Sequence, residues 1–349
     1  MPEPSAQEPQ PTPTVEEPSE FPTGMMPEGT EPKGTATDTV TGTATTVGFL
    51  GPAGTFSEQA ILRDPQLANS SHVPYGQTTE VLFAVDAGEV DFGVVPVENA
   101  IEGSVNAVID TLAFDVNVLI QREVLEPVSL SLLTIPGTPV ESIERLYAIP
   151  IAAAQCREWI RENLPNVKHV AANSNAEAAQ LVAEGNDSRS AAIANDRAGH
   201  IYSLESAAAG IEDHKGNATR FVTLGRGHIP APTGHDKTSI VVFQKSDEPG
   251  SLLAILQEFA ARAINLSLLL SRPTKQSFGE YCFVLDLDGH ISDPVVADCL
   301  LNLRAKQGAV KFLGSYPAAS ENGHEVRQQA TSAMVEANKW MSELQGLIG

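Results

Sequence analysis

A hydroxyl, a guanidinium and an aromatic ring follow one another at Thr219, Arg220 and Phe221. An arginine can hold a carboxylate with two parallel hydrogen bonds, and a threonine can donate a hydrogen bond to a departing oxygen. A phenylalanine ring can keep water away from such a reaction. Because Thr-Arg-Phe is also ordinary strand sequence, the triplet indicates a site only in company with other motifs.

A glycine-rich turn over residues 51–57 leads straight into a predicted helix. Glycines let the backbone approach a ligand, and free N–H groups at a helix start favour an anionic oxygen. The spacing of Gly48, Gly51 and Gly54 matches neither the dinucleotide-binding fingerprint nor a P-loop. The turn therefore predicts a carboxylate site, not a nucleotide site.

A third motif, Val97-Glu98-Asn99, ends a predicted buried strand in polar residues just before another helix start. Ligands of α/β sheets bind at the carboxyl ends of strands. The motif alone is also common in plain turns. It is the joint presence of the three motifs that indicates a site.

The elements that must position these motifs begin at Thr46, where short apolar runs alternate with amphipathic stretches. This pattern predicts an α/β architecture. The predicted strands are 47–50, 92–97, 116–120, 129–134, 167–170, 191–194 and 221–224. The predicted helices are 57–67, 79–87, 104–112, 152–163, 175–184 and 196–203. Four helices are expected to begin at a capping side chain, namely Ser57, Thr79, Ser104 and Asn175.

A stretch rich in glycine and proline over residues 225–234 indicates a boundary between domains. Strand, helix, strand, strand, helix and strand follow in that order, which is the ferredoxin-like motif. The predicted ranges are 238–243, 250–261, 265–270, 281–287, 294–303 and 310–313. Residues 320–347 show apolar residues at near-helical spacing and predict a helix packed on the body or on a neighbouring subunit.

The 349-residue chain carries 44 acidic and 22 basic residues, a formal net charge of −22. Such a charge repels phosphate backbones and anionic lipids, so we expect no nucleic-acid and no membrane partner. Residues 1–45 are acidic, rich in proline and poor in apolar side chains, which predicts a disordered tail. No secretory signal, Cys-x-x-Cys pair or His-Glu-x-x-His motif is present, which predicts a cytoplasmic protein without a metal site.

Eight segments of the chain match the motifs of one known family. Four lie in the first part of the chain: Gly48-Phe49-Leu50-Gly51-Pro52-Ala53-Gly54-Thr55-Phe56-Ser57, Pro96-Val97-Glu98-Asn99, Gln155-Cys156 and Thr219-Arg220-Phe221. Four lie after the linker: Pro249-Gly250-Ser251-Leu252-Leu253, Ile264-Asn265-Leu266, Ser271-Arg272-Pro273 and Leu313-Gly314-Ser315-Tyr316-Pro317. Over about residues 46–317 the chain thus resembles prephenate dehydratase, and the last four segments resemble its C-terminal ACT regulatory domain.

The resemblance implies a catalytic domain of two lobes, similar to periplasmic binding proteins, with prephenate between them and no cofactor. The implied organisation is a tail (1–45), the catalytic domain (46–226), a linker (227–236), the ACT domain (237–317) and a C-terminal helix (318–349). The implied catalytic residues are Thr219, Arg220 and Asn99. The implied substrate-binding residues are Gly51, Pro52, Ala53, Gly54, Thr55, Phe56, Glu98, Gln155, Asn175 and Phe221.

The ACT resemblance implies feedback inhibition by L-phenylalanine and assembly into a homodimer or a homotetramer. The implied effector-binding residues are Pro249, Gly250, Ser251, Leu252, Leu253, Asn265, Leu266, Ser271, Arg272 and Pro273. The leucines among them are equally well explained by core packing.

The chain departs from the family pattern at four positions of the expected site, Ala100, Ala148, Ile149 and Asn175. These residues replace hydroxyl or imidazole side chains, and the loss of one hydrogen bond to a charged ligand costs ~1.5–3 kcal/mol. Two alternatives to an active prephenate dehydratase therefore stay open. One is a catalytically silent relative that senses an amino acid, and the other is an enzyme that acts on arogenate.

Overall fold

The computed structural model describes residues 45–244, 248–275 and 280–319, together with 339–341, 343 and 345–346. The predicted tail, apart from residue 45, and most of the predicted C-terminal helix lie outside the described residues. The described residues 339–341 are helical. Among the residues that are described, no helix is long and apolar enough to cross a bilayer.

The first lobe is built on a sheet with the strand order β2-β1-β3-β11-β5, and the short β4 pairs with β3. β1 runs parallel to β2 and β3, whereas β11 is antiparallel to β3 and β5. The strands are β1 (Thr46–Leu50), β2 (Ser71–Tyr75), β3 (Phe92–Asn99), β4 (Gly103–Ser104), β5 (Leu119–Pro127) and β11 (Ala218–Gly225). The helices are α1 (Phe56–Arg63), α2 (Thr78–Ala87) and α3 (Asn106–Phe114).

Apolar side chains of this sheet divide between two cores because successive strand residues face opposite sides. Phe221 and Val94 pack under α1, together with Ile61 of that helix. Val222 and Val95 belong to a second core, which contains residues of α2 and α3. The face on which a residue of β3 or β11 lies therefore decides which neighbours it has.

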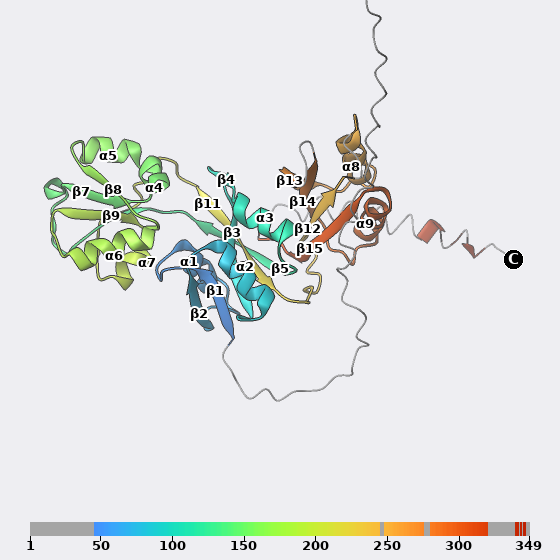
Figure 1. The fold of residues 1–349 in the computed structure, drawn as a ribbon, viewed down its shortest axis with the longest axis horizontal. Helices are drawn as coiled ribbons and strands as arrows, with labels where there is room; N and C mark the ends of the chain where they lie inside the picture. Colours follow the sequence, from blue (N-terminus) through green and yellow to red (C-terminus); the bar gives the residue numbers. More distant parts are fainter. Residues whose placement is uncertain are drawn as a thin grey trace, which may run out of the picture. The chain divides into compact units, whose positions relative to one another are not determined.

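The second lobe has the strand order β10-β6-β9-β7-β8. Its helices cover both faces of the sheet, α4 and α5 on one face and α6 and α7 on the other (Figure 1). The strands are β6 (Ser131–Thr134), β7 (Arg145–Ala148), β8 (Lys168–Ala171), β9 (Ser190–Ala194) and β10 (Glu205–Ala208). The helices are η1 (Val140–Ser142), α4 (Pro150–Gln155), α5 (Arg157–Asn163), α6 (Asn175–Gly185) and α7 (Asp196–Ile201).

Two segments connect the lobes. The chain leaves the first lobe after β5 and returns to it at β11. The Val128 N–H donates a hydrogen bond of 2.8 Å to the Asn217 carbonyl, which ties the two connections together. This double crossing is the two-lobed arrangement expected from the sequence.

The C-terminal unit has the element order β12, α8, β13, β14, α9 and β15, and so forms the predicted βαββαβ fold. Its sheet order is β13-β14-β12-β15. One face packs against α8 and α9, and the other contributes Val241, Val284 and Leu313 to a core of the first lobe. The elements are β12 (Asp236–Phe243), α8 (Ser251–Ala260), β13 (Leu266–Pro273), β14 (Tyr281–Asp288), α9 (Pro294–Lys306) and β15 (Ala309–Pro317).

Several boundaries differ from the sequence-based expectations. The strand expected at 116–120 begins at Leu119 and continues to Pro127. The helix expected at 152–163 is interrupted at Cys156, because Asp213 inserts there: its N–H donates to the Gln155 carbonyl and its carboxylate accepts from the Glu158 N–H. Four strands were not predicted. They are β4, of two residues, and β2, β7 and β10, of four or five residues each.

The expected helix caps were wrong by one or two residues. The observed cap residues are Thr55, Gln77, Val105 and Ser174, in place of Ser57, Thr79, Ser104 and Asn175. At α1 and α6 a hydroxyl of the true cap residue accepts a hydrogen bond from the N–H three residues on. Capping by a short polar side chain is therefore correct in kind but displaced in position at α1 and α6, whereas Val105 caps α3 without a side-chain hydrogen bond.

Candidate active site

Thr219 stands at the start of β11 with Asn99 directly across on β3. The Asn99 Nδ2 group donates a hydrogen bond of 2.9 Å to the Thr219 Oγ1. The Asn99 Oδ1 accepts from the N–H groups of Ile101 and Glu102, at 3.0 Å each, and this fixes the orientation of the amide. Because the Thr219 oxygen accepts a bond from Asn99, the hydroxyl proton can be donated to another group.

A β-bulge brings this pair together. Between Arg220 and Phe221 the strand β11 advances by one residue while β3 advances by two. The extra residue of β3 is Val97. Because successive side chains alternate between the faces of a sheet, the bulge moves Asn99 onto the face of Thr219.

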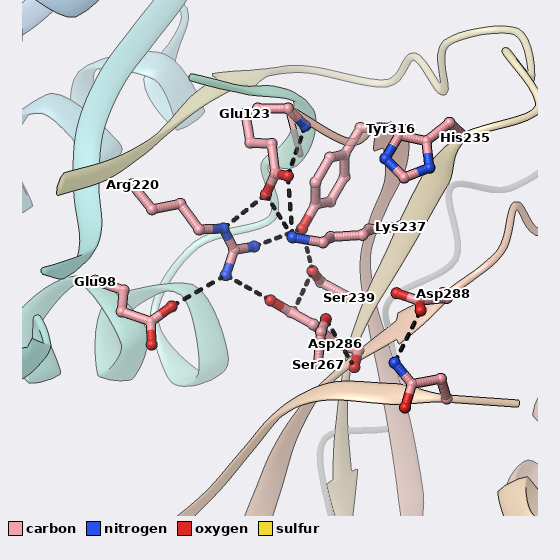
Figure 2. A network of polar contacts seen from close by, with 12 residues as sticks. Glu98, Glu123, Arg220, His235, Lys237, Ser239, Ser267, Asp286, Asp288 and Tyr316 are labelled. Atoms are coloured by element: carbon pink, nitrogen blue, oxygen red, sulfur yellow. Dashed lines mark hydrogen bonds and ion pairs between the residues drawn. The ribbon is translucent and has the colours of Figure 1, made fainter. Parts of the chain in front are cut away.

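Arg220 lies on the opposite face of β11, so the expectation that its guanidinium faces the same site as Thr219 is wrong. Its side chain is 10% exposed and forms ion pairs of 2.7 Å with both Glu123 and Asp286 (Figure 2). Its Nη2 also donates to the Tyr316 hydroxyl at 2.9 Å. Neighbouring strand residues point in opposite directions, which excludes a shared site for residues 219 and 220.

Glu98 is also not beside Thr219. Its carboxylate lies 3.7 Å from the Arg220 guanidinium, on the side that faces the C-terminal unit. Phe221 is 2% exposed and packs in the core under α1, so its ring supports the sheet and does not line an open site. Of the residues expected from the two motifs, the structure brings only Asn99 and Thr219 together.

The charges around Arg220 are balanced within the protein. Burial acts to lower the pKa of Arg220, but Asp286, Tyr316 and Glu123 raise it by more, so it stays fully protonated. Burial raises the pKa of Glu123, but the positive charges of Arg220 and Lys237 outweigh this effect and hold the pKa of Glu123 below its ordinary value. The guanidinium is therefore committed to protein carboxylates.

The glycine-rich turn contains an anion supplied by the protein itself. The Gly54 N–H donates to the Glu58 carboxylate at 2.6 Å, and the Gly51 N–H donates to the Tyr75 carbonyl at 2.9 Å. These two amides are therefore not open to a substrate carboxylate, contrary to the expectation, and Pro52 has no N–H. Of the first-turn N–H groups of α1, that of Glu58 donates to the Thr55 hydroxyl, and those of Phe56 and Ser57 have no acceptor within the helix.

Glu58 also joins the two lobes. Arg197, in α7 of the second lobe, donates to its two oxygens at 2.8 and 3.0 Å. Burial acts to raise the pKa of Glu58, but the hydrogen bonds from Arg197 and Gly54 outweigh this effect, so the pKa of Glu58 lies below its usual value. Asn195 adds a hydrogen bond of 2.8 Å to Gln59. The start of α1 is thus fixed against the second lobe.

Other predicted residues come from the second lobe and its edge. Gln155 reaches the loop after Asn99, where its Nε2 lies 3.4 Å from a carboxylate oxygen of Glu102. Asn175 follows the cap of α6, and its Oδ1 is buried without a hydrogen-bond partner among the described residues. An unpartnered buried acceptor is unfavourable, and a ligand that donates to it would remove this cost.

At three further positions this chain has an apolar residue where the family pattern has a hydroxyl or an imidazole group. Ala148 ends β7, and Ile149 caps α4 without a side-chain hydrogen bond. Ala100 contributes its N–H, which donates to the Ala218 carbonyl at 2.9 Å.

Sequence reasoning missed Glu58, Asn195 and Arg197, and also Glu126. Asn195 follows a buried strand just as Asn99 does, so the same rule could have found it. Glu126 lies across from Thr219 on β5 and is 2% exposed. Burial raises its pKa, and its ion pair with Arg63 offsets part of that effect.

The C-terminal unit has a cavity of about 570 Å³ between α8 and β14. Five of the expected effector residues line it, namely Gly250, Ser251, Leu252, Leu253 and Ser271. Tyr281, Phe283 and Leu256 also line it and were not predicted.

The other expected effector residues are not part of this lining. Arg272 points to the first lobe, where its Nε and Nη2 lie 2.7 and 2.9 Å from the Asp110 carboxylate of α3. Asn265 donates to Asp288, and Leu266 packs in the core under the helices. Pro249 and Pro273 are exposed beside the lining residues. Arg272, like Arg220, thus joins the first lobe to the C-terminal unit.

A two-lobed α/β domain with polar groups at its strand ends, followed by a βαββαβ domain with its own cavity, is the architecture of an enzyme joined to a small-molecule-binding domain. Comparison with known proteins gives the family. Residues 47–229 match the family model of prephenate dehydratase, and residues 238–305 match that of the ACT domain.

A prephenate dehydratase from Mycolicibacterium gilvum is 38% identical over 309 residues, which cover 85% of this chain and 97% of the relative. The crystal structure of prephenate dehydratase in complex with L-Phe from Arthrobacter aurescens has 37% identity and a TM-score of 0.76, and covers 86% of this chain and 99% of that one. The quorum-quenching acylase GqqA has 26% identity and a TM-score of 0.70, over 78% of this chain and 98% of its own.

The chain therefore belongs to the prephenate dehydratase family of lyases, and its C-terminal unit is an ACT domain. The family resemblance and the fold class expected from the sequence are confirmed.

Proposed function

We propose that this chain converts prephenate to phenylpyruvate, carbon dioxide and water in L-phenylalanine biosynthesis. The bond to the ring carboxylate breaks, its electron pair enters the ring, and the hydroxyl on the opposite ring carbon leaves as water once it has gained a proton. Because the product ring is aromatic, the reaction is downhill, and the enzyme must mainly position the substrate and assist the departing hydroxyl.

The observation that carries the proposal is the hydrogen bond between Asn99 and Thr219. It leaves the Thr219 proton available to the leaving hydroxyl. A threonine is too weak an acid to transfer this proton alone, so its role is a positioned hydrogen bond or a relay through water.

The substrate carboxylates need a binding site other than Arg220. The N–H groups of Phe56 and Ser57 in the first turn of α1 and the side-chain amide N–H of Gln155 are the proposed contacts, since helix starts favour anions. Asn175 would hold a carboxylate through its Nδ2 group, because its unpartnered Oδ1 is an acceptor. The turn residues Ala53 to Phe56 then form the wall on the side of the first lobe.

A direct assay tests the proposal. The purified full-length chain is incubated with prephenate, and phenylpyruvate is followed by its absorbance in base. We expect turnover in wild type and a loss of more than about tenfold in kcat for Thr219→Ala. An unchanged rate in the variant would remove Thr219 from the mechanism.

The same assay separates the alternatives. Faster turnover of arogenate than of prephenate would make the chain an arogenate dehydratase. Binding of L-phenylalanine without turnover of either acid would make it a silent sensor.

The proposal includes feedback inhibition by L-phenylalanine bound in the ACT cavity. The apolar side chains of Leu252, Leu253 and Phe283 suit an aromatic ring, and the relative from Arthrobacter aurescens was solved with L-Phe. Calorimetry with L-phenylalanine, and inhibition of the prephenate assay, test this part.

We further propose a homodimer or a homotetramer in the cytoplasm. Leu253 is 59% exposed at the rim of the cavity, and a second copy of the chain would cover such a surface. The three cysteines are buried free thiols, which fits a reducing compartment. Sedimentation equilibrium gives the number of subunits.

A further inference from the structure

One buried ion network joins the ACT domain to the strand that carries Thr219. Arg220, the residue after Thr219, lies 2.7 Å from Asp286 of β14. The Asp286 side chain is 3% exposed, and its Oδ1 accepts a hydrogen bond of 2.5 Å from Ser239. The Tyr316 hydroxyl lies between Ser239 at 2.7 Å and the Arg220 guanidinium at 2.9 Å (Figure 2).

The rest of the network is Glu123 of the first lobe and Lys237 of β12 in the ACT domain. Glu123 of β5 pairs with Arg220 at 2.7 Å and with Lys237 at 3.0 Å, and its side chain is 1% exposed. Two cations and two carboxylates are thus buried together, and their charges cancel. Removal of the charge of Asp286 leaves the Arg220 guanidinium short of one partner, which a buried network tolerates poorly.

Strand β14 faces this network on one side and the ACT cavity on the other. Tyr281 and Phe283 line the cavity. Asp286 and Val284 face the first lobe, since alternate residues of a strand point to opposite faces. A ligand that moves Phe283 therefore acts on β14, the strand whose Asp286 forms the ion pair with Arg220. Only the thickness of one sheet separates the cavity from the network.

We propose that Asp286 is a positioning residue for the reaction: through Arg220 it fixes the start of β11 and with it the Thr219 hydroxyl. We also propose that this contact is the link through which a ligand in the ACT cavity changes turnover. The inference rests on the proposed function and extends it, because it assigns to one ion pair the coupling between effector and reaction.

The test compares Asp286→Asn with Asp110→Asn in the full-length protein. Both variants remove a carboxylate charge that pairs with an arginine between the same two units, but Asp110 contacts Arg272 and not Arg220. For Asp286→Asn we expect kcat to fall about tenfold with KM changed by less than about threefold. The dissociation constant of L-phenylalanine should stay the same while inhibition weakens. For Asp110→Asn we expect kcat to stay within about twofold of wild type.

Hydrogen exchange tests the link without any turnover. L-phenylalanine should change the exchange rates of the amides in Ala218–Gly225 of wild type, and this change should be absent in Asp286→Asn. If wild type fails to convert prephenate, the proposed function fails, and the exchange result still decides the coupling.

Two results would overturn the inference. One is Asp286→Asn with wild-type kcat, inhibition and exchange response. The other is an equal fall in kcat for both variants, which would mean that any loosening of the contact between the first lobe and the ACT domain has the same effect.

If Asp286→Asn does not fold, as judged by its thermal transition, Tyr316→Phe replaces it, because this change removes the hydroxyl that accepts a hydrogen bond from Arg220 and keeps the ring. We expect it to lower kcat about threefold, again with unchanged L-phenylalanine binding, and unchanged kcat and inhibition would overturn the inference.

Discussion

The side-chain amide of Asn99 lies 2.9 Å from the Thr219 hydroxyl oxygen because Val97 forms a bulge in β3. In a regular strand the parity of β3 would place Asn99 on the other face of the sheet. The bulge therefore gives Thr219 a partner that donates to it, and leaves the hydroxyl proton for another acceptor.

Replacement of Asn99 by aspartate should reverse the direction of this hydrogen bond. An aspartate can still accept from the N–H groups of Ile101 and Glu102, so the loop keeps its shape. It cannot donate to Thr219 and would instead accept a hydrogen bond from the Thr219 hydroxyl, so that the hydroxyl can no longer donate to the substrate. We expect kcat to fall by about tenfold to a hundredfold, with an unchanged melting temperature. Steady-state kinetics and calorimetry measure both, and a wild-type kcat would contradict the assigned role.

Glu58→Gln should change how stability depends on pH. The pKa of Glu58 is lowered from 4.5 in the folded protein, so its ionised form stabilises the fold above that value. This contribution disappears as the pH falls through the folded-state pKa. Urea unfolding at pH 7 and about pH 3.5 should therefore show a smaller loss of unfolding free energy for the variant than for wild type.

The control for Glu58 is Glu144→Gln. Glu144 pairs with Arg189 at 3.5 Å, and both side chains are about 60% exposed, at 63% and 59%. Exposed pairs of this kind contribute ~0–1 kcal/mol. The control should follow the wild-type pH dependence, and a loss in Glu58→Gln as large as in wild type would count against the pair with Arg197.

The sequence was sufficient for the order of the elements in the ACT domain, for most elements of the catalytic domain and for the family, because apolar periodicity and motif spacing are local features. It was not sufficient for the direction of Arg220. Its ion-pair partners, Glu123 and Asp286, lie far from Arg220 in the sequence. The triplet itself contains no information about which charged residues the fold brings next to Arg220. The alternation of strand residues would have excluded a site shared by residues 219 and 220.

The glycine-rich turn shows a second limit. Its amides were expected to hold a ligand, yet Glu58, only four residues after Gly54, occupies one of them. A carboxylate in the first turn of a helix is a local signal that part of the helix start is already satisfied. The sequence contained this information, whereas the pairing of Glu58 with Arg197 depends on the contact between the lobes.

The three cysteines should be unreactive in the folded protein. Burial raises the pKa of Cys156 to about 12 and those of Cys282 and Cys299 to about 11. Since the thiolate is the reactive form, a disulfide reagent at about pH 8 should label none of them in the native state and all three in denaturant. Rapid labelling of the native protein would contradict the burial of these residues.

Gly54→Ala should weaken the contact between the lobes. Gly54 has a φ of +92°, and a Cβ there would lie 3.2 Å from the Ala198 Cα in the second lobe. Gly137 is a matched control, with a φ of +79° and, in the part of the chain that the structure describes, no atom within 4 Å of its Cβ position. Each substitution should cost about 1 kcal/mol for the left-handed backbone. Only Gly54→Ala should also lower kcat, and equal kinetics of the two variants would exclude a role for the close approach.

Leu253→Glu should weaken the binding of L-phenylalanine to the ACT cavity. The leucine lines the cavity, and a carboxylate in its place would repel the carboxylate of the amino acid and remove apolar surface from its ring. We expect the dissociation constant measured by calorimetry to rise by more than about tenfold. The control is Leu301→Glu on α9, which is 70% exposed and outside the cavity lining, and which should bind like wild type. Equal affinities in both variants would mean that the effector binds elsewhere. Phe283 would then not contact the effector, and the proposed coupling through β14 to Arg220 would lose its starting point.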